Sequence, residues 1–227
     1  MSQQNHYSAF AKKYKEEIIN SDDPSIWTTD ISKNGPVSGR MKIRINTQKK
    51  LFINNFKKEY KIFDIGCGFG RQSFLLAKEG FEVIGIDTNQ SFIDIAVDIF
   101  KKHSLKGSFY CRNLQDAFTD EKFHQLILLD VLEHIPPSKR KRFIKALHLY
   151  CYNNSTLIIS IPKIKSSFKD WFFNFSKYFI YPFLKTHEHP YSIPSKNSVK
   201  TILGNLFEIT FTDFNEETVF FICKARK

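Results

Sequence analysis

Glycines at residues 66, 68 and 70 follow an acid, Asp64, where an apolar run gives way to a helical pattern. Glycine has no Cβ and adopts left-handed backbone angles, so a ligand can approach the chain closely there. A second acid, Asp87, ends the next apolar run about twenty positions after the first glycine, where a carboxylate can accept the hydroxyl groups of a ribose. The pattern predicts a turn that binds a nucleoside.

The spacing of the glycines separates two kinds of ligand. A dinucleotide-binding turn has the form G-x-G-x-x-G, whereas here residue 71, directly after the third glycine, is an arginine. A pyrophosphate is therefore not the expected ligand. An ordinary tight turn is the alternative interpretation of the glycines alone, and the two neighbouring acids argue against it.

The histidines are candidates for a base that removes a proton from a hydroxyl group, because their pKa lies near neutrality. His134 follows Glu133 just after an apolar run, and it either lines the site or packs at a helix start. His187, His189 and Tyr191 belong to a later loop, where we expect one of the two histidines at the site; the alternative is a turn residue bonded to the backbone. The other histidines are expected at the surface or at helix ends: His6, His103, His124 and His148.

Short apolar runs alternate with helical stretches from residue 61 onward, which is typical of a parallel sheet with crossover helices. The last two runs are joined by a short acidic turn, which predicts an antiparallel hairpin at one edge of the sheet. We therefore predict an α/β fold with a doubly wound, Rossmann-like, mostly parallel seven-stranded sheet. The expected strands are residues 61–65, 82–86, 107–111, 125–129, 156–161, 207–212 and 218–223.

Helical patterns precede the first of these strands. An amphipathic helix near the start is followed by a basic helix that begins near Arg40 or Thr47 and ends at Lys58. Residues 1–60 are therefore predicted to form an N-terminal helical cap, and residues 61–227 the main domain.

Residues 163–186, after the fifth strand, form an insertion rich in aromatic side chains. Its apolar surface exceeds what docking on one core requires. Residues 168–183 could lie in a membrane interface, or they could form a lid over an apolar acceptor. A dimer contact or plain helix packing is the simpler alternative.

The composition of the 227 residues indicates a globular protein with an excess of positive charge. The net charge of +11 favours anionic partners, but no RNA-recognition motif or zinc finger is visible, so nucleic acid is not an expected partner. Four widely spaced cysteines argue against a zinc cluster or a disulfide framework. Because we see neither a signal peptide nor an apolar run of the ~20 residues that span a bilayer, we predict a cytoplasmic protein.

The chain resembles the class I S-adenosylmethionine-dependent methyltransferases at these residues. The resemblance spans residues 61–162, and its last motif is most similar to the ubiquinone-biosynthesis-type O-methyltransferases. The motifs are Asp64-x-Gly66-x-Gly68-x-Gly70, Val83-x-Gly85-x-Asp87 and Asp130-Val131-Leu132-Glu133-His134-Ile135.

This resemblance implies S-adenosyl-L-methionine as cofactor and S-adenosyl-L-homocysteine as product. It places the methionine part at Asp64 and the glycine loop, the ribose at Asp87 and the adenine at Asn113, whose amide oxygen can replace the acid usual in the family. The implied cofactor-binding residues are Asp64, Gly66, Cys67, Gly68, Gly70, Asp87, Asn113, Leu114 and Asp130. The candidates on the acceptor side are His134, His187, His189 and Tyr191.

Asp130, Glu133 and His134 stand at i, i+3 and i+4, so with His187 or His189 they could bind a divalent ion. A metal-dependent RNA methyltransferase uses a comparable group of carboxylates and histidines. Because the Leu-Glu-His run is common in metal-free relatives, we predict no metal.

The predicted function is transfer of a methyl group to a small-molecule acceptor, at an oxygen of an apolar, aromatic or lipid-like metabolite. A metal-assisted RNA methyltransferase and a non-catalytic binding module on the same fold are the alternatives. We expect a monomer or homodimer in the cytoplasm, with a peripheral membrane contact through residues 168–183 left open.

Overall fold

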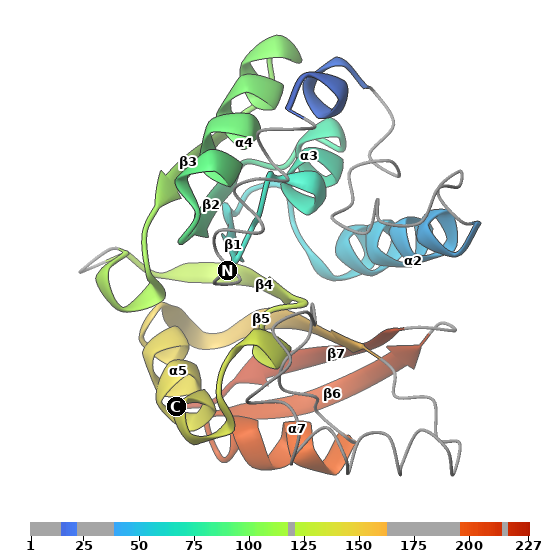
Figure 1. Ribbon diagram of the computed structural model, residues 1–227. Coiled ribbons are helices and arrows are strands. Elements are labelled where there is room, and N and C mark those ends of the chain that lie inside the picture. The colour runs from blue at the N-terminus through green and yellow to red at the C-terminus, as the bar shows by residue number, and fades with distance from the viewer. Residues whose placement is uncertain (1–14, 22–38, 118–120, 163–195, 215–217) are drawn as a thin grey trace, which may run out of the picture.

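Seven strands form one sheet in the order β3-β2-β1-β4-β5-β7-β6 (Figure 1). The computed structural model describes residues 15–21, 39–117, 121–162, 196–214 and 218–227. Strands β1 to β5 pair in parallel, and β7 is antiparallel to both β5 and β6, so the predicted fold class is confirmed. The strands are β1 (Ile62–Ile65), β2 (Val83–Asp87), β3 (Gly107–Cys111), β4 (Phe123–Leu129), β5 (Cys151–Pro162), β6 (Phe207–Phe214) and β7 (Thr218–Ala225).

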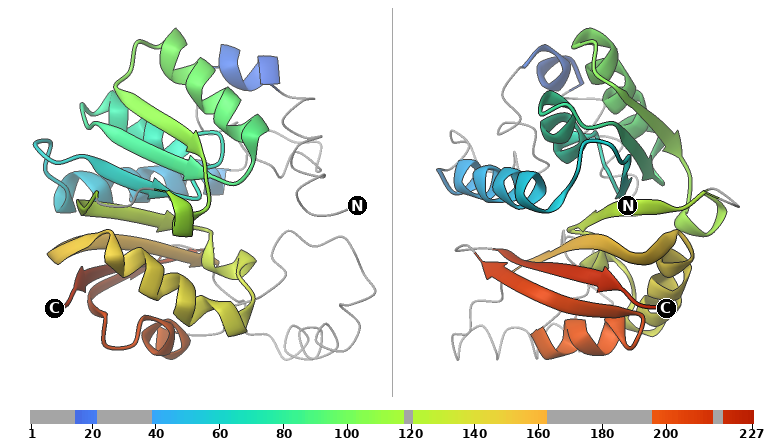
Figure 2. Two further views of the ribbon diagram at one scale, coloured as in Figure 1. Left: turned by 90° about the vertical axis from the view of Figure 1, so that its left-hand side faces the viewer. Right: turned by 180° about the vertical axis from the view of Figure 1, so that it is seen from behind.

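Helices cover both faces of the sheet, as Figure 2 shows for α2 and α5. In β4, Leu126 and Leu128 belong to the same core cluster as Ile144 of α5, because alternate residues of a strand face opposite sides. Between them, Ile127 packs with Phe52 of α2. The helices are α2 (Gly39–Asn55), α3 (Arg71–Lys78), α4 (Gln90–Lys102), α5 (Pro137–Leu149) and α7 (Lys196–Leu203), with short 3-10 turns η2 (Leu114–Asp116) and η3 (Leu132–His134).

The predicted N-terminal cap is described in part. Residues 15–20 are helical, and Ile18 is buried against α3 and α4. Helix α2 contributes Leu51 and Phe52 to a core cluster that it shares with β1, β4, β5 and β7. The division into a cap and a main domain stays a prediction.

Helix α2 ends at Asn55 rather than at the predicted Lys58, because a buried glutamine binds the chain just beyond it. The side-chain amide of Gln125, at the start of β4, donates to the carbonyl oxygens of Lys57 (3.0 Å) and Tyr60 (3.1 Å). Its oxygen accepts the backbone N–H of Lys57. These bonds divert the backbone groups of Lys57 from the helix into the turn that leads to β1.

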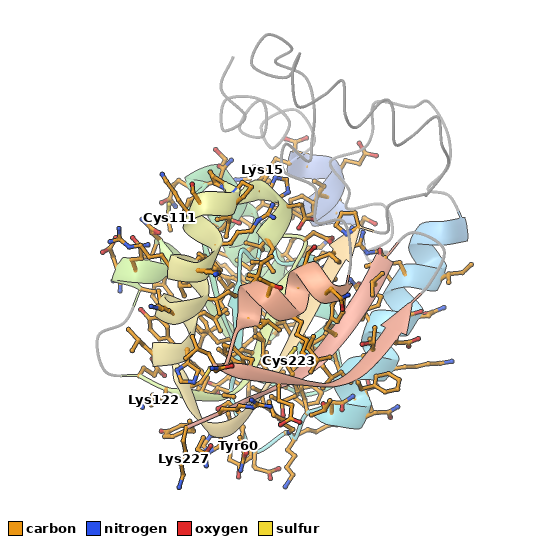
Figure 3. All side chains as sticks on the ribbon, turned by 90° about the horizontal axis from the view of Figure 1, so that it is seen from below. Lys15, Tyr60, Cys111, Lys122, Cys223 and Lys227 are labelled. Atoms are coloured by element: carbon orange, nitrogen blue, oxygen red, sulfur yellow. The ribbon has the colours of Figure 1, made fainter. Side chains whose placement is uncertain are left out.

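The two ends of the parallel strands are separated in Figure 3, where Cys111 marks the carboxyl end and Tyr60 and Lys122 mark the amino end. Cys111 ends β3, whereas Tyr60 and Lys122 precede β1 and β4. Ligands of open α/β sheets bind beyond the carboxyl ends of the strands, so the site is expected on the side of Cys111. Among the described helices, none is both long and apolar enough to cross a membrane.

Candidate functional site

The glycine loop connects the carboxyl end of β1 to α3. The backbone N–H groups of Gly66 and Cys67 donate to the carbonyl oxygen of Ile86, at 2.8 and 3.0 Å, which fixes the loop to β2. Gly66 and Gly68 have φ values of 73° and 55°, in the left-handed region that favours glycine. A Cβ on Gly66 would lie 2.5 Å from Cγ2 of Val131, whereas a Cβ on Gly68 would meet no atom within 4 Å. Gly66 is therefore needed for packing, and Gly68 borders open space.

Asp87 stands at the end of β2 and holds the loop by its carboxylate. Oδ2 accepts the backbone N–H of Gly68 at 3.0 Å, and Oδ1 accepts that of Asn89 at 2.9 Å. Burial raises the pKa of Asp87, and these backbone bonds oppose the rise. An ionised carboxylate has about four lone-pair positions, so Asp87 can also accept ribose hydroxyls.

Asp64 lies beneath the loop and is only 3% exposed. Its Oδ2 accepts the hydroxyl of Ser73 from α3 at 2.5 Å. Burial raises the pKa of Asp64 to about 7; the hydrogen bond from Ser73 opposes this shift and the charge of Asp87 adds to it. The structure therefore shows Asp64 as an internal support that links β1 to α3.

Of the other predicted cofactor residues, Cys67 lies within this loop, and Asn113 and Leu114 follow β3. Cys67 is buried, which raises the pKa of its thiol well above the ordinary value. Asn113 is exposed just before η2, and Leu114 is buried with its carbonyl oxygen accepting the Tyr150 hydroxyl at 2.8 Å. The backbone N–H of Arg112 donates to the carbonyl oxygen of Asp87 at 2.9 Å, so the segments after β2 and β3 adjoin.

Asp130, directly after β4, has a φ of 57°, which is rare for a residue other than glycine. Its carboxylate forms an ion pair with Arg44 of α2. Its Oδ1 also accepts the hydroxyl of Ser160 at 2.8 Å, and its backbone N–H donates to the same hydroxyl oxygen at 3.1 Å. Arg44 and Ser160 lie 86 and 30 positions from Asp130, and no motif in the sequence links them to it.

The short turn η3 carries Glu133 and His134. Glu133 is fully buried, and burial raises its pKa to about 7 against the charges of Arg44 and Arg140. Arg140 fixes this turn, since its Nε donates to the carbonyl oxygens of Leu132 (3.1 Å) and Ile135 (3.0 Å). His134 is half-buried in the same turn. Within the described part of the chain, no three acid, histidine or cysteine side chains are placed to hold a metal ion.

Several predicted residues fall outside the described ranges. They are His187, His189, Tyr191 and the aromatic insertion at residues 163–186. Their contribution to the site stays a prediction.

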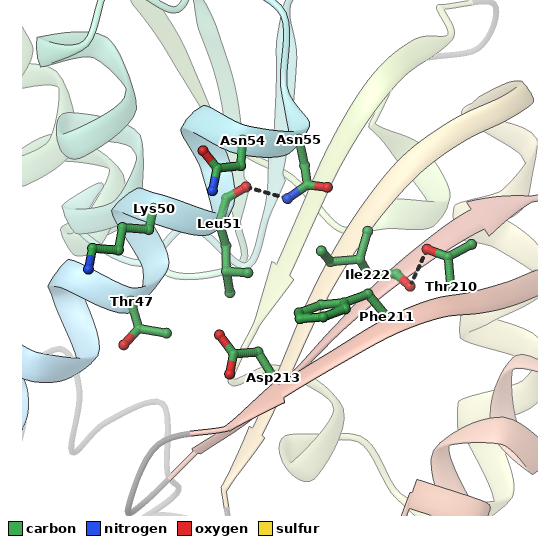
Figure 4. Close-up of a pocket in the computed structure, with 9 residues that line it drawn as sticks. All are labelled: Thr47, Lys50, Leu51, Asn54, Asn55, Thr210, Phe211, Asp213 and Ile222. Carbon is green, nitrogen blue, oxygen red and sulfur yellow. Dashed lines mark hydrogen bonds between the residues drawn. The ribbon is translucent and has the colours of Figure 1, made fainter.

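A pocket of about 580 Å³ lies elsewhere, between α2 and the β6–β7 hairpin (Figure 4). Phe211 and Asp213 point toward α2 in this view. None of the predicted site residues lines the pocket, so we do not assign the cofactor to it. Its lining residues are Thr47, Lys50, Leu51, Asn54, Asn55, Thr210, Phe211, Asp213 and Ile222.

Comparisons with known proteins match the central part of the chain. A family model described as "Methyltransferase domain" matches residues 62–151. The ubiquinone biosynthesis O-methyltransferase of Rickettsia conorii is 28% identical over 159 residues, which are 68% of this chain and 54% of that protein. The protein of the same name from Rickettsia typhi is 32% identical over 111 residues, 49% of this chain and 44% of that protein. The chain thus spans about half the length of these relatives.

Solved structures share the fold at low sequence identity. Magnesium protoporphyrin IX methyltransferase from Synechocystis PCC 6803, crystallised with bound SAH, has a TM-score of 0.65 at 18% identity, covering 97% of this chain and 100% of that one. The [4+2]-cyclase SpnF has a TM-score of 0.66 at 11% identity, covering 95% and 94%, so the fold alone does not fix the reaction. Residues 62–151 thus match a methyltransferase domain, and the chain is similar to ubiquinone biosynthesis O-methyltransferases over its central part.

Proposed function

We propose that the chain binds S-adenosylmethionine over the glycine loop and catalyses methyl transfer to an oxygen of a small acceptor. The observation that carries the proposal is the position of the Asp87 carboxylate, which accepts the backbone N–H of Gly68. A Cβ built on Gly68 would meet no atom within 4 Å, so there is open space beside this carboxylate. A loop so held leaves room for a ligand beside a carboxylate that accepts hydroxyl groups.

The cofactor, when bound, supplies a methyl group on a sulfonium that is already an activated leaving group. The chain therefore mainly needs to align the acceptor and to remove its proton. His134, half-buried in η3, is the proposed base, and His187, His189 and Tyr191 are proposed to complete the acceptor side. The names of the relatives support an oxygen as the methylated atom.

Calorimetry with S-adenosylhomocysteine tests the cofactor half of the proposal. The full chain should bind the ligand, and Asp87→Asn should weaken binding at least about tenfold because the amide replaces a charged acceptor. Asp94→Asn is the matched control, since Asp94 is exposed on α4 and bonded to Gln90. Absence of both binding heat and a thermal shift for the unmodified chain would reject the proposal.

Transfer of label from tritiated S-adenosylmethionine to a panel of catechols and phenols tests the acceptor half. We further propose that residues 168–183 make a lid or a peripheral membrane contact in a cytoplasmic protein, either monomeric or dimeric. Sedimentation with anionic liposomes at low salt tests the membrane contact, and protein that stays in the supernatant would exclude it.

A further inference from the structure

The turn after β4 carries two acids and a histidine within five residues, a composition that suits a divalent cation. In the structure, however, a side chain supplies the cation. The Arg44 guanidinium contacts the Asp130 carboxylate, and the two side chains are only 16% and 23% exposed. The charge of Arg44 also acts on Glu133, where it opposes the effect of burial on the carboxyl pKa.

A second arginine occupies the backbone oxygens of this turn. Arg140 is 5% exposed and donates to the carbonyl oxygens of Leu132 and Ile135, which flank Glu133 and His134. Carboxylate and carbonyl oxygens are the groups that would bind a hard cation such as magnesium. Around this turn, the Asp130 carboxylate and the carbonyl oxygens of Leu132 and Ile135 are therefore engaged by guanidinium groups.

Arg44 is also near the cofactor side, because its partner Asp130 precedes Val131, whose Cγ2 would lie 2.5 Å from a Cβ on Gly66 of the glycine loop. Arg71, the residue directly after Gly70, has a pKa lowered to about 9 by burial and, second, by the charge of Arg44. The same guanidinium thus affects groups after β1 and groups after β4. Methyl transfer must take place between these two sides, because one is proposed to bind the cofactor and the other the acceptor.

We propose that Arg44 is a built-in cation that stands in for a divalent metal ion and stabilises the acceptor oxygen as it loses its proton. The inference rests on the proposed function and adds a catalytic residue to it. A guanidinium keeps its charge at all working pH values and stabilises a developing oxyanion most strongly where water is excluded. Asp130, held by Ser160, positions the guanidinium.

Removing the guanidinium should raise the affinity of the turn for a cation. With Arg44→Gln, Asp130 loses its ion-pair partner and keeps its hydrogen bond from Ser160. Manganese(II) is the probe, and its binding to the full chain is measured by calorimetry and by its paramagnetic resonance. Arg44→Gln should bind manganese at least about tenfold more tightly than the unmodified chain, since one repelling charge is lost and one carboxylate is freed. Arg44→Gln combined with Asp130→Asn should lose this binding again.

Two controls keep the result interpretable. Lys50→Gln removes one positive charge from an exposed position on the same helix and should leave manganese binding unchanged. Arg44→Lys keeps the charge and should remain a weak manganese binder. Manganese should raise the unfolding temperature of Arg44→Gln alone, which also shows that this variant folds.

Activity supplies the second readout, with the phenol or catechol that the unmodified chain methylates. Chelation should leave that activity unchanged, and Arg44→Gln should lower kcat at least about tenfold with partial recovery in added guanidinium. Restoration of a chelated enzyme by magnesium would overturn the inference, as would equal manganese binding by Arg44→Gln and the unmodified chain. Failure of S-adenosylhomocysteine to bind would instead reject the proposed function and leave the manganese result readable.

Discussion

The two sides of the proposed crevice are built in different ways. Around the glycine loop, Asp87 accepts the backbone N–H of Gly68 and Asp64 accepts the hydroxyl of Ser73, all within about one βαβ unit. Around the turn after β4, Asp130 is held by Arg44 from α2 and by Ser160 from β5. The first side is a local motif, whereas the second depends on tertiary contacts. Substitutions far from Asp130 in the sequence, in α2 or β5, should therefore affect activity through this turn.

The contact between Gly66 and Val131 joins the two sides, so it offers the largest expected effect. Gly66→Ala places a Cβ 2.5 Å from Cγ2 of Val131 at a positive φ, and should lower the free energy of unfolding by about 3 kcal/mol or more. Gly68→Ala adds only the strain of its backbone, about 1 kcal/mol, and should mainly weaken cofactor binding. Urea unfolding and calorimetry measure both effects. Equal destabilisation by the two substitutions would show that the Val131 contact is unimportant.

The pH dependence of stability compares one buried acid from each side. Between the ordinary pKa of Asp64, 3.8, and its folded value of about 7, the native chain holds a proton that the unfolded chain releases. The proton bound to Asp64 therefore stabilises the folded chain fully below pH 3.8, and this stabilisation is lost as the pH rises through about 7. Glu133 acts in the same direction from 4.5 to about 7.

The free energy of unfolding should fall less between pH 5 and pH 7.5 in Asp64→Asn and in Glu133→Gln than in the unmodified chain. The difference should be about 2 kcal/mol for each variant. Thermal or urea unfolding at a series of pH values provides the measurement. Asp94→Asn, which replaces an exposed acid on α4, serves as the control. A fall that remains as steep in both variants as in the unmodified chain would contradict the role of these acids.

Substitution of two serines of β5 distinguishes an effect on the position of Asp130 from an effect on general stability. Ser160 bonds to Asp130, whereas Ser155, earlier in the same strand, donates to the carbonyl oxygen of Phe123 at 2.7 Å. Replacing either with alanine should cost about 1 kcal/mol, because each removes a buried hydrogen bond. Only Ser160→Ala should also lower kcat. If Ser155→Ala lowered kcat equally, the effect would be one of general stability.

Substitutions of two buried glutamines should change the free energy of unfolding in opposite directions. Gln48 on α2 is fully buried, and no described residue forms a hydrogen bond with its amide. Gln48→Leu should therefore raise the free energy of unfolding by about 1 kcal/mol. Gln125 makes three hydrogen bonds, so Gln125→Leu should lower it. Urea midpoints of the two variants decide, and a loss of stability in Gln48→Leu would contradict the argument.

The sequence predicts the first side well because its signals are local. Strand periodicity, the glycine spacing and Asp87 place the sheet and the loop correctly, and the structure confirms the mostly parallel order. Strand β5 begins at Cys151 rather than at residue 156, since Cys151 pairs with Phe123 before an irregularity in the register. Such an extension of a strand depends on pairing with the neighbouring strand, so no alternation of apolar residues in the sequence indicates it.

The second side is harder to predict for the same physical reason. The sequence indicates a basic helix before the first strand, but it does not indicate which of its cations lies over β4. Only the packing of α2 on the sheet brings Arg44 to Asp130, across 86 positions. The histidines and tyrosine of residues 187–191 stay predictions because they lie outside the described ranges.

Two residues near opposite ends of β4 hold the segment that contains α2. Gln125, near the start of the strand, bonds to Lys57, and Asp130, directly after the strand, pairs with Arg44. The number of helical residues between these attachments is therefore set by the length of one strand. A single residue inserted in the middle of α2 would rotate Arg44 by roughly 100° about the helix axis while Lys57 stayed in place. Natural variation in this helix should accordingly occur by substitution, with insertions and deletions confined to the segments outside it.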